Sequence, residues 1–351
     1  MNGKSYWQKR SVYNHILQVR RMERLDEEFT ELFLNLTKDL NKEITYWYLQ
    51  FAKDGELTSL KANERLNQKQ LKEIKTDVYD FIKKAKDNID GKYTKELNYI
   101  YNRVQLNRLE CLRAVIDLKL IELYHKVDET LKKELQDAYI EAQERLQYDI
   151  SKANGKLIEW SLPTEDTINT IISKPWASDG NNFSSTLWEN KAKLLNALET
   201  DLRVGFVKGY SIAKITQNMA NKIYSKDKKA TAMYQVRRVV HTEVGYFAEE
   251  SKTKALTDLG VEKYEIEATL DSNTCSICSA RDREVYKYDD RIVGQTAPVF
   301  HPFCRCTTVP YFEDDFEDSK RFARDKDGNP IYVPASMTYK EYYEKYLKGG
   351  E

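Results

Sequence analysis

Cys275-Ser276-Ile277-Cys278 and, after 22 further residues, His301-Pro302-Phe303-Cys304-Arg305-Cys306 form the stretch around which this chain is organised. The stretch contains four of the five cysteines of the chain. Cys275 with Cys278, and His301 with Cys304, are spaced so that one turn of chain can present both side chains to a metal ion. Two such pairs joined by a loop are typical of a tetrahedral zinc site.

The zinc interpretation needs four ligands, and the stretch offers five. We expect Cys275, Cys278, His301 and Cys304 to bind the ion, with Cys306 as a competing ligand. Cys306 is expected to face away from Cys304 along an extended chain. A filled site of this kind is structural, and zinc would contribute about 10 kcal/mol to ordering a module with little core. The alternatives are unligated thiols or a redox C-x-x-C, which lacks its usual βαβ context here.

The composition describes a polar, largely helical protein. Among 351 residues, 56 are Lys or Arg and 56 are Asp or Glu, so overall charge gives no argument for nucleic-acid binding. The 13 glycines and 7 prolines are few for this length, which disfavours an all-β fold. No apolar run reaches the roughly 18 residues that span a membrane, so we expect no membrane partner. Clustered cysteines without a secretory signal indicate a reducing compartment.

Apolar residues at helical spacing predict a long helical N-terminal half. An apolar stripe from Phe29 to Phe51 predicts one helix. The basic residues 1–24 are either the start of this first helix or an arm that contacts phosphate or an acidic partner surface. A second helix is predicted at 57–86 and is broken at 88–91. No Gly or Pro lies between Gly91 and Gly155, so the near-heptad stripe there, which includes Leu97, Ile100 and Val104, predicts a coiled-coil-like spine or two joined helices. Cys111 is expected to be a buried small hydrophobe on it.

Shorter elements are predicted in the C-terminal half. Ser161 is expected to open a short helix, and Ser184-Ser185 to cap a helix over 186–204 that 205–209 breaks. Ser211 is expected to cap a further short helix, and Gly260 to end a helix over 226–259. Strands are predicted at 264–270, 285–286 and 307–309, and a terminal helix at about 339–347.

These elements predict a mainly α protein in four parts. They are an extended helical region at 1–155, a helical domain at 156–260, a small α+β strand-and-loop Cys/His module at 261–312, and a charged C-terminal tail with a short helix at 313–351. A long helical spine is more typical of a scaffold or an assembly protein than of an enzyme.

His241-Thr242-Glu243 suggests an alternative, enzymatic interpretation. An H-x-E helix followed by C-x-x-C occurs in zinc deaminases, where it surrounds a zinc-bound water, so His241 and Glu243 could act with Cys275 and Cys278. Thr274, however, stands where those enzymes have proline. The deaminase interpretation also leaves His301 and the second cysteine pair unexplained. Otherwise His241 and Glu243 are polar residues of a helix face.

Four arginines lie in or beside the module, and they could contact nucleic-acid phosphates as part of a zinc-stabilised DNA-binding module. They could equally be solvated surface residues. They are Arg281, Arg283, Arg291 and Arg305.

The sequence motifs of this stretch resemble those of a known protein family. The residues from Thr269 to Cys278 read T-x-D-x-x-x-C-x-x-C, and those from Pro298 to Cys306 read P-x-x-H-P-x-C-R-C. Together they resemble the signature of phage head morphogenesis proteins, the Mu F-like minor head (minor capsid) proteins of tailed phages. The resemblance covers roughly residues 190–312. Two departures are His241, where the family commonly has Arg before Thr-Glu, and Arg281-Asp282-Arg283, where it usually has a Gly.

The resemblance implies a minor capsid protein of a tailed phage or prophage, associated with the portal inside the procapsid. Such a protein assists head assembly and DNA packaging or delivery without catalysis. Its implied partners are the portal protein, the scaffold or major capsid protein, and viral DNA. It would lie in the capsid interior at the portal vertex of the virion, and in the host cytoplasm during assembly.

Overall fold

The computed structural model describes residues 4–52, 59–85, 102, 105–155, 162–177, 179–226, 228–312 and 320–348. The chain forms two compact units. The first is built from residues 1–25, 131–182 and 238–351, and the second from residues 26–130 and 183–237. The fold is mainly helical with a few small strands near the C-terminus, as predicted. The four-part domain division stays a prediction.

The first helix, α1 (Lys4–Phe51), continues without a break through the basic segment and the predicted apolar stripe. Within the first unit, Arg10 pairs with Asp149 at 2.5 Å and Arg24 with Glu134 at 2.5 Å. These contacts favour the interpretation of residues 1–24 as the beginning of the helix over that of a separate arm.

The prediction of a single helix at 57–86 is wrong, because the chain forms a short helix α2 (Ser59–Ala62) and then a separate helix α3 (Gln68–Ala85). A reciprocal cap separates them. The Asn67 side chain accepts from the Gln70 amide N–H at 2.9 Å, and the Gln70 side chain accepts from the Asn67 N–H at 3.1 Å. Such a pair satisfies two amides at a helix start and so begins a new helix.

The long spine helix is α5 (Arg108–Asn154), 47 residues in length. Asn107 and Glu110 cap its start by the same reciprocal arrangement, with both bonds at 2.8 Å. Between Cys111 and Ile121 nearly every side chain is buried, so this part is a central core helix rather than a two-stranded seam. Cys111 is fully buried, as predicted, and burial raises the pKa of its thiol. Outside the described residues lie the predicted break at 88–91, the stripe residues Leu97, Ile100 and Val104, and the cap Ser161.

Helices α7 (Phe183–Val207) and α8 (Ile212–Ile223) complete the second unit. The cap predicted at Ser184-Ser185 is wrong: Ser184 lies inside α7 and donates to Asp128 at 2.8 Å. Helix α7 ends at Val207, within the predicted break at 205–209, and Gly209 has φ of 64°, although Gly205 itself is still helical. A Cβ at Gly205 would clash with Cγ1 of Ile215, so glycine serves the close approach of α8. Ser211 caps α8 as predicted, because its hydroxyl accepts from the Lys214 N–H.

Two further helices belong wholly or largely to the first unit. Thr164 caps α6 (Glu165–Ser173). Helix α9 (Ala232–Asp258) begins six residues later than predicted, because the Thr231 hydroxyl accepts from the Tyr234 N–H at 3.2 Å. It ends at Gly260, as predicted, where φ is 76° and the Val261 N–H bonds Leu256 O at 3.0 Å.

A three-stranded antiparallel sheet carries the cysteine stretch. Strand β1 (Lys263–Glu267) lies between β2 (Val285–Lys287) and β3 (Thr307–Pro310), with Glu265 opposite Val285 and Ile266 opposite Thr308. The three predicted strands are confirmed, although β1 ends three residues early. Helix α10 (Ser276–Arg281) follows β1, and a 3-10 turn (Tyr288–Asp290) follows β2.

Strand β3 is held on α9 by buried polar contacts. The Glu249 carboxylate accepts from the Thr307 hydroxyl at 2.6 Å and from the Thr308 hydroxyl at 2.8 Å. The Lys252 ammonium donates to the Thr308 carbonyl at 2.7 Å. These bonds fix the strand that begins directly after Cys306.

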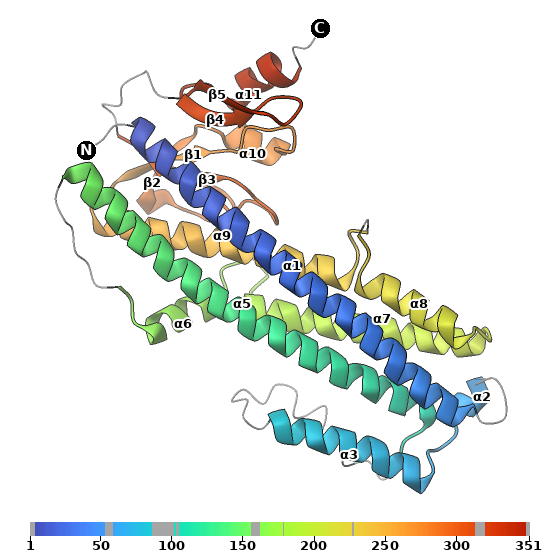
Figure 1. Cartoon of the computed structure of the whole chain (residues 1–351). Coiled ribbons are helices and arrows are strands. Elements are labelled where there is room, and N and C mark those ends of the chain that lie inside the picture. Colours follow the sequence, from blue (N-terminus) through green and yellow to red (C-terminus); the bar gives the residue numbers. More distant parts are fainter. Residues whose placement is uncertain are drawn as a thin grey trace. The chain divides into compact units, whose positions relative to one another are not determined.

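The C-terminal segment contains a hairpin that was not predicted, formed by β4 (Lys320–Arg324) and β5 (Pro330–Pro334). Helix α11 (Tyr339–Tyr342) and a π-helical turn (Tyr343–Leu347) follow, so the terminal helix is confirmed. Figure 1 shows the hairpin and α11 grouped with the module strands. The hairpin has its own core of Leu270, Ala323, Val333, Tyr339 and Tyr342. Within the described ranges, no helix is long and apolar enough to cross a membrane.

Candidate metal centre

Each half of the cysteine stretch presents its donors from one turn. Cys275 is the N-cap of α10, and its carbonyl accepts from the Ser279 N–H at 2.9 Å, so Cys278 follows on the first helical turn. In the second half, the Cys304 N–H bonds the His301 carbonyl at 3.0 Å. Phe303 completes that turn with φ of 62°. Each half of the stretch therefore forms a tight turn, and Cys275 and Cys278 fall in one donor group whereas His301 and Cys304 fall in different ones.

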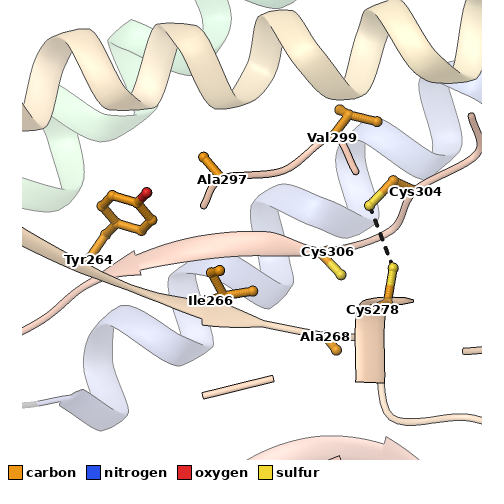
Figure 2. Packing of buried hydrophobic residues seen from close by; sticks show 8 residues of the cluster. All are labelled: Tyr264, Ile266, Ala268, Cys278, Ala297, Val299, Cys304 and Cys306. Atoms are coloured by element: carbon orange, nitrogen blue, oxygen red, sulfur yellow. Dashed lines mark hydrogen bonds between the residues drawn. The ribbon is translucent and has the colours of Figure 1, made fainter. Parts of the chain in front are cut away.

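The two halves meet at Cys278. His301 Nε2 lies 3.1 Å from Cys275 Sγ and 3.0 Å from Cys278 Sγ. Cys278 Sγ lies 3.8 Å from Cys304 Sγ, as the dashed line in Figure 2 marks. Thiolates about 2.3 Å from a central zinc ion lie about 3.8 Å apart in a tetrahedron. The donor set and this spacing fit zinc.

The prediction that Cys306 faces away from Cys304 is wrong. Side chains alternate along an extended chain, so residues two apart share a face. The sulfurs of Cys278, Cys304 and Cys306 accordingly lie within 4.8 Å of one another, and Figure 2 shows Cys304 and Cys306 on the segment that enters β3. A second group within 4.8 Å joins Cys275, Cys278 and His301. Cys278 belongs to both groups, so the choice between Cys304 and Cys306 stays open.

The donor atoms are prepared for ligation. His301 Nδ1 lies 2.8 Å from the Pro302 carbonyl. If Nδ1 carries the proton and donates there, Nε2 presents its lone pair to the sulfurs, which is the tautomer that binds a metal. Hydrogen bonds from Cys278 and then Cys306 lower the pKa of the Cys304 thiol, while hydrogen bonds within the cluster raise the pKa of the Cys278 and Cys306 thiols, so a thiolate is favoured at Cys304.

Burial differs between the two sides of the donor cluster. Cys278, Cys304 and Cys306 are at most 7% exposed and belong to the module core. Tyr264, Ile266, Ala297 and Val299 also belong to this core (Figure 2). Cys275 and His301 are half-buried, so the cysteine side of the cluster is covered while the side of these two donors is partly accessible.

A carboxylate that the sequence analysis did not select supports the second half of the site. Asp271 accepts from Arg305 at 2.8 Å, and from the Asn273 N–H at 3.0 Å. Arg305 lies between Cys304 and Cys306, and its carbonyl accepts from the Thr269 hydroxyl at 3.0 Å. The T-x-D part of the signature contains this signal, because it places the acid close before the first cysteine.

The four arginines considered for phosphate binding have internal partners. Arg281 donates to the Gln295 carbonyl at 2.9 Å and lies over the Phe300 ring. The other three form ion pairs within the first unit: Arg283 with Glu265, Arg291 with Glu250, and Arg305 with Asp271. This arrangement favours a structural role. Nucleic-acid binding by these residues stays a prediction.

His241 and Glu243 lie outside both donor groups. The Glu243 carboxylate accepts from Trp176 Nε1 at 2.9 Å, and the Trp176 ring stacks on Tyr246 with centroids 4.1 Å apart. The His241 ring lies 5.2 Å from the Phe303 ring. His301, and not His241, is therefore grouped with Cys275 and Cys278.

Glu243 makes stability depend on pH. Burial raises the pKa of Glu243 to about 7, although the bond from Trp176 lowers it. The folded state therefore holds a proton between pH 4.5 and 7 that the unfolded state releases, so stability falls as pH rises through this window. We expect Glu243→Gln, which still accepts from Trp176, to remove this fall and to be about 1–3 kcal/mol more stable than wild type at about pH 8. Urea unfolding at about pH 5 and about pH 8 measures this, and equal pH dependence in both proteins would contradict it.

Comparison with known proteins gives one finding for this region. Residues 196–309 match the family model described as Phage Mu protein F like protein. The match includes both halves of the cysteine stretch and confirms the Mu F-like resemblance. Searches of curated proteins and of solved structures gave no significant match.

Proposed function

We propose that this protein is a minor head protein that assists head morphogenesis in a tailed phage or prophage, without catalysis. The observation that carries the proposal is the Mu F-like match over residues 196–309. The burial of Cys278, Cys304 and Cys306 supports a structural role for the donor cluster. The long helices support a role in assembly.

Within this proposal, the protein associates with the portal and lies in the capsid interior. Scaffold or major capsid protein and viral DNA are further proposed partners, with host cytoplasm as its location during assembly. Purified procapsids and virions should contain the protein by mass spectrometry, in fewer copies than the major capsid protein. Its absence from both particles would overturn the proposal.

Portal association has its own test. An affinity-tagged portal protein of the same phage, co-expressed with this chain, should retain the chain on the affinity resin. The same experiment with tagged major capsid protein tests the second proposed contact. Retention by neither would reject both proposed protein contacts.

DNA binding has a separate test. Binding of the protein to duplex DNA should weaken steeply as the salt concentration rises if phosphate contacts carry the binding.

We further propose one structural zinc ion bound by Cys275, Cys278, His301 and Cys304, with Cys306 as the competing ligand. The support is the convergence of the five donors and the 3.8 Å sulfur separation at Cys278. The zinc would join the two halves of the stretch and order the module.

Elemental analysis of single variants tests the ligand set. We expect zinc content to fall in His301→Ala and Cys304→Ala and to persist in His241→Ala and Glu243→Ala. The zinc content of Cys306→Ala decides whether Cys306, rather than Cys304, is the fourth ligand. Loss of zinc in His241→Ala with retention in His301→Ala would instead support the deaminase-like enzyme.

A further inference from the structure

Asp282 lies at the centre of a buried network directly after the helix that carries Cys278. Its carboxylate accepts from both Arg321 nitrogens at 3.0 Å, and from the backbone N–H groups of Ala268 at 2.9 Å and Tyr339 at 2.7 Å. The side chains of Asp282 and Arg321 are 1% and 4% exposed. One carboxylate thus joins β1, α10, β4 and α11.

Arg321 completes the network from the other side. It also donates to the Ala268 carbonyl at 2.8 Å and to the Met337 carbonyl at 3.2 Å. A buried ion pair is costly to desolvate unless its remaining donors and acceptors are bonded, and here they are. Removing the guanidinium would leave the Asp282 carboxylate buried without its counter-charge.

The second half of the donor set is reached by the same C-terminal segment. The Tyr339 hydroxyl donates to the Asp271 carbonyl at 3.1 Å. The Asp271 side chain in turn bonds Arg305, the residue between Cys304 and Cys306. Residues 320–348 therefore contact the supports of both cysteine pairs while contributing no cysteine or histidine of their own.

We propose that residues 320–348 form a C-terminal clamp that holds the cysteine–histidine cluster in its metal-binding geometry. Arg321 is its main positioning residue, acting through Asp282 on α10 and hence on Cys278. Tyr339 acts through Asp271 on the turn of Cys304 and Cys306. This inference rests on the proposed zinc site and extends it to a segment outside the matched region 196–309.

The test compares Arg321→Met with Arg324→Met in the full chain. Arg324 lies on the same strand, but its exposed side chain donates to the Gly328 carbonyl. Changing groups that orient metal ligands costs about 10- to 100-fold in metal affinity. We expect Arg321→Met to release zinc to a chromogenic chelator about 10- to 100-fold faster, Arg324→Met to match wild type, and Arg321→Lys to recover part of the loss.

A second readout separates the clamp from the zinc proposal. In metal-free protein, the alkylation rate of the buried Cys278 thiol reports opening of the cluster, with buried Cys111 as internal reference. We expect faster alkylation of Cys278 alone in Arg321→Met. If wild type binds zinc and Arg321→Met releases zinc at the wild-type rate, the clamp proposal is overturned. Absence of zinc from wild type, together with faster alkylation in the variant, would reject the zinc proposal and keep the clamp.

A milder variant covers the case in which Arg321→Met does not fold. Tyr339→Phe removes one hydroxyl and leaves the ring in the core formed with Leu270 and Val333. It should speed alkylation of Cys304 and Cys306 more than that of Cys278, with an unchanged far-ultraviolet circular dichroism spectrum. Equal rates for wild type and Tyr339→Phe would contradict its part in the clamp.

Discussion

Cys278→Ser is expected to abolish zinc binding and to unfold the module around residues 261–312. Cys278 is shared by both donor groups, so its loss separates Cys275 and His301 from Cys304 and Cys306. Structural zinc contributes about 10 kcal/mol to ordering small modules, so we expect the module to depend on the ion. Elemental analysis should fall from one zinc per chain to none, and hydrogen exchange of β1 and β3 should lose protection.

Cys111→Ser is the matched control, because Cys111 is a fully buried cysteine of the second unit. It should keep its zinc while losing some stability. Treating wild type with a strong chelator should reproduce the Cys278→Ser exchange pattern. Module strands that remain protected after complete zinc removal would show that the core suffices without the ion.

Lys191→Met is expected to destabilise the protein by about 3–5 kcal/mol. Lys191 on α7 forms an ion pair with Asp117 on α5, and the two side chains are 4% and 8% exposed. Truncating the ammonium leaves a carboxylate in the core of the second unit. The cost of such an uncompensated charge exceeds that of losing a surface pair. Chemical denaturation followed by circular dichroism measures the change.

Two comparisons isolate the buried charge as the cause. Lys193→Met, two residues further on the same helix, alters a side chain that is 73% exposed and should leave stability nearly unchanged. The double variant Asp117→Leu/Lys191→Met should recover most of the loss, because the buried carboxylate is gone. A double variant as unstable as Lys191→Met would attribute the loss to packing instead.

The cysteine stretch could be predicted because its chemistry is local. Two donors on one turn are fixed by spacing alone, so the pairing of Cys275 with Cys278 followed from sequence. The convergence of Cys306 was missed although its signal was present: a separation of two along extended chain places both thiols on one face. The apolar stripes predicted the helices, because burial of one face repeats every three to four residues.

Helix boundaries were missed where amide side chains act as caps. Asn67 with Gln70 and Asn107 with Glu110 each form reciprocal bonds that begin a helix. The N-x-x-Q and N-x-x-E spacings carried this information. Gly205, in contrast, reads as a helix breaker, and its role becomes visible only when Ile215 of the next helix is placed against it.

The C-terminal hairpin had a turn signal that the sequence analysis passed over. Asp325 accepts from the N–H groups of Asp327 and Asn329, and Gly328 has φ of 85°. Alternation in β4, where Arg321 and Ala323 are buried, completes the pattern. The pairing of Arg321 with Asp282, 39 residues apart, has no local signature, because it depends on how distant segments pack.

Arg283 stands in the loop where the family resemblance leads one to expect glycine, and its φ of 74° lies in the left-handed region. That conformation costs an L-residue other than glycine about 1–2 kcal/mol. The Arg283 guanidinium pairs with Glu265 and lies 4.0 Å from Glu267. The chain therefore has arginine, rather than the glycine that the family resemblance leads one to expect, at a backbone conformation that favours glycine.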